Sequence, residues 1–364
     1  CSKDSALEQY ALSKQRKPSV SATIGECIKS YPELSGRISS IDRSFEKQPF
    51  LFQKPDISKR LFGNNMNISA TQIEEYHHCA FRYFCRYGIK AQPNERAKFD
   101  PRQYGSAVHY IFEKLLSPEY GVERLAKQSA DERIKAVESV LDSYLEQLGG
   151  KDEKSATFMH LYKKIVSSAV IILDRLIAEL TDSEFKPSQV ELSIGGDNDP
   201  ISYEIRLPDG GKVFIRGKID RVDELKKNDE SGNEIDYIRV IDYKTGEKQF
   251  VLYDVLCGIN IQMLLYLSAI TQNGSELFGS NIVPCGVLYM PSSTSYISAE
   301  RDNYIKTEEE IESERNNALS MKGIVVNDDK IISAMNGKGA FIKNKSSNSK
   351  SDPPVLTCSP KELN

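Results

Sequence analysis

The chain has 364 residues, of which 39% are hydrophobic and 27% are charged. This composition is typical of a folded globular protein of one or two domains, and it excludes a disordered, collagen-like or coiled-coil chain. The 48 lysines and arginines against 52 aspartates and glutamates give a net charge of −4. No overall basic charge therefore points to nucleic acid, although a local basic channel is compatible with this balance.

Seven cysteines are spread along the chain without a CxxC pair. Their odd number and wide spacing favour a reducing compartment, by default the cytoplasm, over a disulfide framework. The most apolar run, 165–173, is far shorter than the roughly 20 residues that a membrane-spanning helix needs. Since the sequence starts with neither an apolar signal region nor a methionine, we expect an excised piece of a longer protein. We expect no membrane partner.

Residues 1–65 carry short helical patterns interrupted by prolines and glycines, and they predict a helical lead-in to a larger domain. Ser69 and Gln72 form a potential capping box, which predicts a helix from that point to about Tyr87. Longer stretches of helical periodicity follow. They predict helices over 102–116, 122–148 and 156–181.

Strand-like runs then replace the helical patterns. They predict strands over 189–194, 201–207, 213–222, 237–243 and 282–290, with a helix over 252–271 before the last strand. This order predicts an α/β domain over 66–345 with a mixed β-sheet flanked by helices, and it is too irregular for a Rossmann fold or a TIM barrel. Residues 346–364 predict a polar, loop-like tail.

Two acidic residues stand in strands that are otherwise β-branched and aromatic, Asp220 and Asp242. Burying a carboxylate there costs several kcal/mol unless it is paired or binds a metal. If the two strands are neighbours, the two acids come side by side, and alternation puts Lys244 on the face of Asp242 while Tyr243 points away.

A hard divalent cation would remove the repulsion between two such carboxylates, which favours Mg²⁺ or Mn²⁺ over zinc. The backbone carbonyl of Tyr243 is a further candidate oxygen ligand, and Lys244 is placed to assist an attacking water or to offset charge on a phosphate. These groups suit hydrolysis of a phosphodiester. The alternative is that Asp220–Arg221 and Asp242–Lys244 are ordinary ion pairs at strand ends, which is the better interpretation for either piece alone.

Two helical motifs add polar groups to this set. Gly105 and His109 lie one helical turn apart, with the glycine allowing a close backbone approach and the histidine available to a metal or to the scissile strand. Gln262 and Tyr266 share one face of an otherwise apolar helix, where they either form a simple amphipathic face or bind the DNA backbone and steady the site.

The four motifs GxxxH, GxxD, DYK and QxxxY occur here as Gly105/His109, Gly217/Asp220, Asp242–Lys244 and Gln262/Tyr266. In this order they resemble the RecB-type nucleases of the PD-(D/E)xK superfamily. The resemblance implies a restriction-endonuclease-like fold. It also implies His109, Asp220, Asp242 and the Tyr243 carbonyl as metal ligands, Lys244 as the catalytic lysine, and Gln262 and Tyr266 as active-site or DNA-contacting residues.

Two further segments resemble the AddB (RexB) family within that group. They are 68–84, which includes Cys79, and 321–335. The resemblance covers about 65–345 and implies that residues 1–65 end a helicase-like region. It implies an AddB-type subunit that pairs with an AddA-type helicase–nuclease subunit and cuts single strands, the 5′-terminated one, at double-strand breaks during homologous recombination in the bacterial cytoplasm.

In that family a cysteine equivalent to Cys79 joins three others beyond the nuclease core to hold a [4Fe–4S] cluster. After residue 335 this sequence contains only Cys358, so we expect either a chain cut before the cluster cysteines or a protein without the cluster. A zinc site formed by His77, His78, Cys79 and Cys85 is a weaker alternative, because adjacent histidines on a helix point apart.

Phosphate contacts are expected in a local channel. Its candidate residues are Arg82, Arg86, Lys90, Arg216, Lys218 and Arg221, for each of which a solvated surface charge is at least as good an interpretation. Two alternatives to an AddAB-type nuclease remain. One is a free-standing RecB-like nuclease, and the other is a catalytically silent DNA-binding scaffold of the same fold.

Overall fold

The structure of the chain is a computed structural model, which describes residues 2–46, 55–91, 101–148, 156–196, 198–246, 249–294, 300–301, 304–337 and 355–363. It divides into two compact units, Cys1–Ile57 and Ser58–Asn364. The division lies before the boundary expected at residue 65.

The N-terminal unit is helical in its described part. It contains α1 (Lys3–Arg16), α2 (Pro18–Lys29), a 3₁₀ turn (Pro32–Leu34) and α3 (Ser35–Phe45). Four buried side chains, Leu7, Tyr10, Ile28 and Leu34, form its small core. The Tyr10 hydroxyl donates a hydrogen bond to Asp42 at 2.7 Å, which ties α1 to α3. Helix α4 (Pro55–Phe62) leads into the second unit.

The second unit is built on an eight-stranded mixed sheet, in which β1, β4, β5, β6, β9 and β10 follow one another and β2 and β3 also pair with β4. The strands are β1 (Asn65–Ser69), β2 (Lys186–Ile194), β3 (Glu204–Arg206), β4 (Lys212–Asn228), β5 (Glu234–Lys244), β6 (Ile282–Pro291), β9 (Lys322–Val326) and β10 (Val355–Cys358). The short strands β7 (Glu300–Arg301) and β8 (Tyr304–Ile305) form a separate pair.

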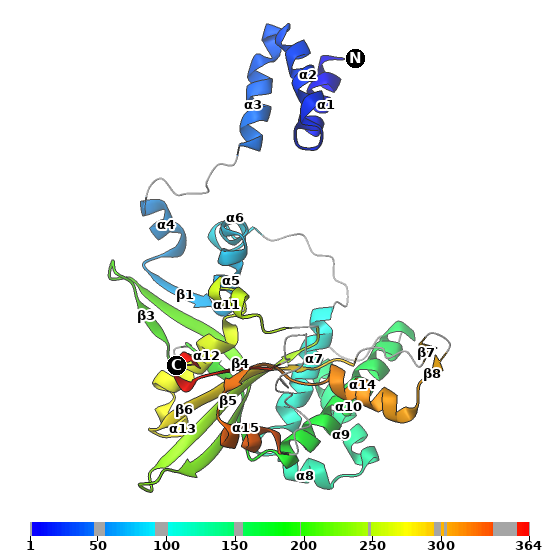
Figure 1. Cartoon of the computed structure of the whole chain (residues 1–364), viewed down its shortest axis with the longest axis vertical. Coiled ribbons are helices and arrows are strands. Elements are labelled where there is room, and N and C mark those ends of the chain that lie inside the picture. The colour runs from blue at the N-terminus through cyan, green and yellow to red at the C-terminus, as the bar shows by residue number, and fades with distance from the viewer. Residues whose placement is uncertain are drawn as a thin grey trace. The chain divides into compact units, whose positions relative to one another are not determined.

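Two buried apolar clusters cover the two faces of this sheet, since alternate residues of a strand point to opposite faces. Ile241 and Tyr243 belong to the cluster formed with α7 (Pro101–Leu115), α9 (Ala130–Gln147) and α10 (Ala156–Asp182). Val240 belongs to the cluster formed with α12 (Gln262–Asn273). Figure 1 shows α7, α9 and α10 gathered beside β4 and β5, with α12 apart from them.

Shorter helices surround this core. They are α5 (Ala70–His78), α6 (Ala80–Tyr83) with a π turn (Phe84–Gly88), α8 (Val122–Lys127), α11 (Leu252–Leu256), α13 (Ser275–Phe278), α14 (Glu308–Ala318), α15 (Asp329–Asn336) and α16 (Pro360–Leu363). No helix within the described ranges is long and apolar enough to cross a membrane.

The predicted α/β class and mixed sheet are confirmed, and so is the capping box at Ser69. The helix predicted from Ser69 to Tyr87 is interrupted at Cys79, which has an extended backbone and whose Sγ atom caps the short helix that follows. The helix predicted over 252–271 is likewise two helices, because the chain turns at 257–261.

Both ends of the sheet differ from expectation. Strand β1, a polar segment with few strand-forming residues, was not predicted, and it pairs in parallel with β4. Residues 355–358 of the expected loop-like tail form β10, which pairs in parallel with β9. The expected loop at 346–354 lies outside the described residues.

Candidate active site

The two strand acids lie next to each other in the structure. Strands β4 and β5 are antiparallel with Arg221 opposite Ile241, so that Asp220 stands opposite Asp242. Asp242 is only 4% exposed, and the Nζ atom of Lys244 lies 2.5 Å from its Oδ2 atom. The side chain of Tyr243 between them points to the other face, as alternation predicts.

His109 on α7 joins this pair through the backbone of Tyr243. Its Nε2 atom is 3.0 Å from the Tyr243 carbonyl oxygen and its Nδ1 atom is 3.3 Å from Asp220 Oδ1. The second oxygen of Asp220 accepts a hydrogen bond from the Tyr243 amide at 2.7 Å. His109 is therefore in direct contact with two other predicted ligands, Asp220 and the Tyr243 carbonyl.

Sequence reasoning missed one acid of the site, Glu191 on β2. The register of β2 and β4 puts it opposite Asp220, and ligand atoms of His109, Glu191 and Asp220 lie within 4.8 Å of one another. Within the described ranges this is the one group of three such side chains. Glu191 has a φ of +51°, a backbone conformation that costs energy for a residue other than glycine and is concentrated at functional sites. The only sequence feature that could have indicated Glu191 was its position as a single acid inside the strand predicted over 189–194.

This set of groups fits a hard divalent cation, because it offers an imidazole nitrogen, carboxylates and a backbone carbonyl in a half-buried site. Burial lowers the pKa of His109, but the hydrogen bond to Asp220 and the charges of Asp220, Asp242 and Glu191 outweigh it and raise the pKa. Burial raises the pKa of Glu191, against the opposing effect of Lys218. A proton on His109 offsets this negative charge, and a cation would replace that proton.

Burial and the neighbouring charge of Asp220 raise the pKa of Asp242 from its usual 3.8 to about 6, despite Lys244. The folded chain therefore binds this proton more tightly than the unfolded chain, so that ionised Asp242 destabilises the fold above pH 6. In EDTA at pH 7.5 we expect Asp242→Asn to raise the free energy of unfolding by about 1–3 kcal/mol. Denaturant titrations measure this gain, which is expected to shrink as the pH falls through 6 toward 4.

The matched control for this change is Glu234→Gln, at the exposed start of the same strand. It is expected to leave the free energy of unfolding within about 0.5 kcal/mol of the unmodified chain. A loss of stability in Asp242→Asn at pH 7.5 would show that the Lys244 ion pair outweighs the burial of the charge.

Tyr266 is buried against β4 and does not lie at the surface. It is 4% exposed, and its hydroxyl oxygen lies only 2.0 Å from where a Cβ atom at Gly217 would be. Burial raises the pKa of the Tyr266 hydroxyl, and hydrogen bonds with Gln262 and with the Lys218 backbone oppose that rise. Gln262 and Tyr266 thus share one turn of α12 and support the part of β4 that leads to Asp220.

A methyl group at position 217 is therefore expected to displace Tyr266 or bend β4. We expect Gly217→Ala to destabilise the fold by about 1–3 kcal/mol. Thermal melts measure this loss. Gly105→Ala is the matched control, since a Cβ atom there would meet Thr245 at an ordinary 3.7 Å, and a stability loss as large as that of Gly217→Ala would contradict the argument. The same distance corrects the expectation that Gly105 is needed for a close backbone approach.

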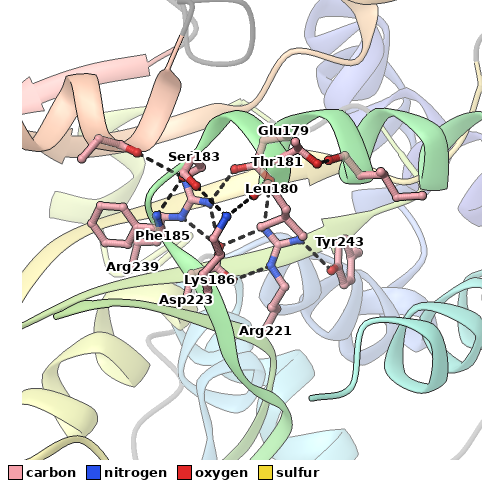
Figure 2. Close-up of polar contacts among 12 residues, drawn as sticks. Glu179, Leu180, Thr181, Ser183, Phe185, Lys186, Arg221, Asp223, Arg239 and Tyr243 are labelled. Atoms are coloured by element: carbon pink, nitrogen blue, oxygen red, sulfur yellow. Dashed lines mark hydrogen bonds and ion pairs between the residues drawn. The ribbon is translucent and has the colours of Figure 1, made fainter. Parts of the chain in front are cut away.

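Arg221 was expected to contact DNA, and this prediction is wrong. Its side chain is fully buried, and Figure 2 shows it among Glu179, Asp223 and Arg239, with Tyr243 beside it. Arg221 Nε lies 2.8 Å from Asp223 Oδ1, and its Nη1 atom donates to the Tyr243 hydroxyl at 3.1 Å. A guanidinium in this position supports the site from inside the protein, out of reach of a phosphate.

We call Glu179, Arg221, Asp223 and Arg239 the buried ion cluster. Arg239 bonds both acids, with Nε 2.8 Å from Asp223 Oδ2 and Nη2 2.5 Å from Glu179 Oε1. Two acids and two bases balance their charges with every side chain at most 1% exposed. Figure 2 also shows Lys186 at the end of α10, where its Nζ atom donates to the Leu180 and Ser183 carbonyls and caps the helix.

Among the other predicted site residues, Lys218 pairs with an acid of the site. Arg82, Arg86 and Lys90 are exposed, while Lys218 pairs with Glu191 at 2.6 Å and so lies beside the acid cluster. Cys79 is exposed at the start of α6, where its Sγ atom accepts from the Arg82 amide at 3.4 Å. The alternative zinc site at 77–85 gains no support, since the described residues there form no group of three ligands.

Comparison with known proteins agrees with this geometry. The family model described as the PD-(D/E)XK nuclease superfamily matches residues 67–335. Proteins named as one of the subunits of an ATP-dependent helicase/deoxyribonuclease are similar over most of this chain. The protein of Clostridium tetani is 31% identical over 76% of the chain, that of Clostridium botulinum 32% over 90%, and that of Thermoanaerobacter pseudethanolicus 33% over 76%.

These relatives are much longer proteins. The matched region is 24% of the length of the Clostridium tetani and Thermoanaerobacter proteins and 28% of the Clostridium botulinum protein. The chain thus spans about a quarter of the curated relatives that it matches.

Proposed function

Because the chain belongs to the PD-(D/E)XK nuclease superfamily, we propose that its second unit is a divalent-metal-dependent deoxyribonuclease that hydrolyses phosphodiester bonds. The observation that carries this proposal is the meeting of His109, Glu191 and Asp220 within 4.8 Å, beside Asp242 and its ion pair with Lys244. A structural ion pair has no need for three further ligand-type groups at the same place, so this arrangement argues against a silent scaffold.

The roles follow from the positions of the groups. His109, Glu191, Asp220, Asp242 and the Tyr243 carbonyl would hold Mg²⁺ or Mn²⁺, the ions that oxygen-rich sites prefer. The bound ion supplies Lewis acidity toward the phosphate and toward the attacking water. Lys244 is 30% exposed in its side chain, so its ammonium group can reach the substrate side of the site and offset charge on the phosphate while Asp242 holds it in place.

The names of the relatives extend the proposal to the longer protein. We assign the chain to the AddB-type component of an ATP-dependent helicase–nuclease, paired with an AddA-type subunit in the bacterial cytoplasm. In that complex it would cut the 5′-terminated strand unwound from a double-strand break during homologous recombination. A [4Fe–4S] cluster with Cys79 as one ligand belongs to the same proposal, and the exposed position of Cys79 is compatible with it.

The test is cleavage of end-labelled single-stranded DNA by the purified chain with Mg²⁺, with Mn²⁺ and with EDTA. We expect cutting that requires the metal and is lost in Asp242→Ala. Calorimetric titration with Mn²⁺ tests the site independently of cutting. If the chain neither cuts DNA nor binds the ion, the nuclease proposal fails and a DNA-binding scaffold takes its place.

A further inference from the structure

A groove of about 1200 Å³ lies on the second unit between α4, β1, α5 and the helical turns at 80–88. The site described above uses none of its lining residues. Three aromatic rings line it, Phe62, Tyr83 and Tyr87. Tyr83 stacks on Phe62 with ring centroids 5.6 Å apart and leans on Tyr87 at 5.2 Å, so the three rings form one continuous aromatic surface.

The same groove carries a local excess of positive charge. Arg82, Arg86 and Lys90 line it together with a single carboxylate, Glu75. Both arginine side chains are more than half exposed, although Glu75, itself only 10% exposed in its side chain, pairs with them. The Arg86 guanidinium also lies 5.6 Å from the Tyr87 ring centroid. The chain as a whole has a net charge of −4, so the groove differs from it in combining several cations with aromatic ring faces.

The groove is connected to two of the elements that carry the candidate active site, α12 and β4. Helix α5 carries Glu75 toward the groove arginines, while the neighbouring Glu74 accepts a hydrogen bond from the Ile261 amide at the start of α12, beside Gln262. Strand β1 ends at Ser69, which pairs with Arg216 of β4. Asp220 follows four residues later on β4, about 13 Å away at the rise of a β-strand. The groove-lining residue of β1 nearest to this point, Asn67, pairs with Phe214, six residues before Asp220. A single strand lying in the groove would therefore have to span about 20 Å, a few nucleotides, to reach the proposed metal ligands.

We propose that this groove binds the single strand of DNA that enters the proposed nuclease site, with bases stacked on the Tyr83–Tyr87 surface and phosphates paired with Arg82, Arg86 and Lys90. A single strand fits because its unpaired bases expose their faces, whereas a duplex keeps its bases stacked on one another. Three cations in one groove suit a polyanion such as DNA. An ordinary peptide segment does not carry a negative charge at each unit and would not match these cations. This assignment rests on the proposed function, since it supplies that site with its substrate.

The test measures the affinity of the chain for a fluorescein-labelled oligothymidylate by anisotropy in EDTA, where no cleavage occurs. Tyr87→Leu keeps an apolar side chain but removes the ring face, and we expect its affinity to fall by about 5- to 100-fold. Arg86→Gln is expected to lower the slope of log affinity against log salt by about 0.7, the loss of one phosphate contact.

A matched pair of the same chemistry exists away from the groove. Arg124 lies 4.6 Å from the Tyr120 ring centroid, and Tyr120→Leu and Arg124→Gln are expected to leave both affinity and salt slope unchanged. The unmodified chain is photocrosslinked to a 5-iodouracil oligonucleotide, and peptide mapping is expected to locate the crosslinks within residues 61–91. This measurement does not depend on the folding of any variant.

The outcomes separate the two proposals. If the chain cuts DNA but the groove variants bind like the unmodified chain and crosslinks fall elsewhere, the groove assignment is overturned and the nuclease proposal stands. If the variants lose affinity while the unmodified chain neither cuts DNA under any condition nor binds Mn²⁺, the groove binds single strands and the nuclease proposal fails. Equal losses in the groove and Tyr120/Arg124 variants would also overturn the assignment.

Discussion

Replacing Asp220 with asparagine is expected to reduce metal-dependent cleavage of single-stranded DNA by about 10³-fold or more. Asp220 stands between the other groups, facing His109 through one oxygen and holding the Tyr243 amide with the other. Loss of its charge weakens the binding of a divalent ion. Such an ion stabilises a phosphoryl-transfer transition state by several kcal/mol. Each 1.4 kcal/mol of that stabilisation corresponds to about tenfold in rate.

Two measurements distinguish this from general damage. Calorimetric titration with Mn²⁺ is expected to show a matching loss of affinity, and thermal melting in EDTA is expected to stay close to that of the unmodified chain, because asparagine can still accept from the Tyr243 amide. Glu234→Gln, at the far end of β5 and exposed, serves as the control for removing one acid. Undiminished cleavage by Asp220→Asn would remove the central ligand from the mechanism.

The second large effect concerns stability. Arg239→Met is expected to lower the free energy of unfolding by about 3–5 kcal/mol, because it leaves Glu179 and Asp223 buried with one partner instead of two. The side chains of the buried ion cluster cannot reach water to compensate, since all are at most 1% exposed. Denaturant-induced unfolding followed by fluorescence or circular dichroism measures the change.

A double variant and a surface control sharpen this test. Glu179→Met together with Arg239→Met removes one charge of each sign, so the pair is expected to be less destabilised than the sum of the single variants. Lys227→Met breaks an ion pair with Glu184 at 3.2 Å whose side chains are 40% and 58% exposed, and such pairs contribute about 0–1 kcal/mol. Equal effects of Lys227→Met and Arg239→Met would show that burial is not what makes the cluster matter.

Sequence alone predicted the elements whose residues carry a local signal. The capping box at Ser69 depends on two side chains three residues apart, and the helix at 101–115 depends on the spacing of its apolar residues. Both signals lie within the segment that they predict. The pairing of Asp220 with Asp242 could be predicted because both acids stand in strands that are otherwise apolar. Their contact with His109, more than a hundred residues earlier, depended on the resemblance to known nucleases.

What could not be predicted depends on contacts between distant segments. Strand β1 is polar, and it is a strand only because β4 offers it an open edge. Arg221 is indistinguishable in sequence from a surface arginine. Its burial depends on two acids that pair with it, Asp223 on its own strand and Glu179 on the distant helix α10. Glu191 carries no motif, and its place in the site follows from the register of β2 on β4.

Strands β1 and β10 also have a consequence for how the chain is made. Strand β1 is synthesised long before its partner β4, because three long helices lie between them in the sequence. Strand β10 can pair with β9 only after residues 355–358 have been synthesised. Until then β9 presents an unpaired strand edge, and the pocket for the buried Val355 is unfilled. The pairing of β1 with β4 joins segments far apart in sequence, which makes it slow. The nascent domain therefore has a prolonged period in which its sheet can pair with other chains, and shielding by a chaperone would matter most then.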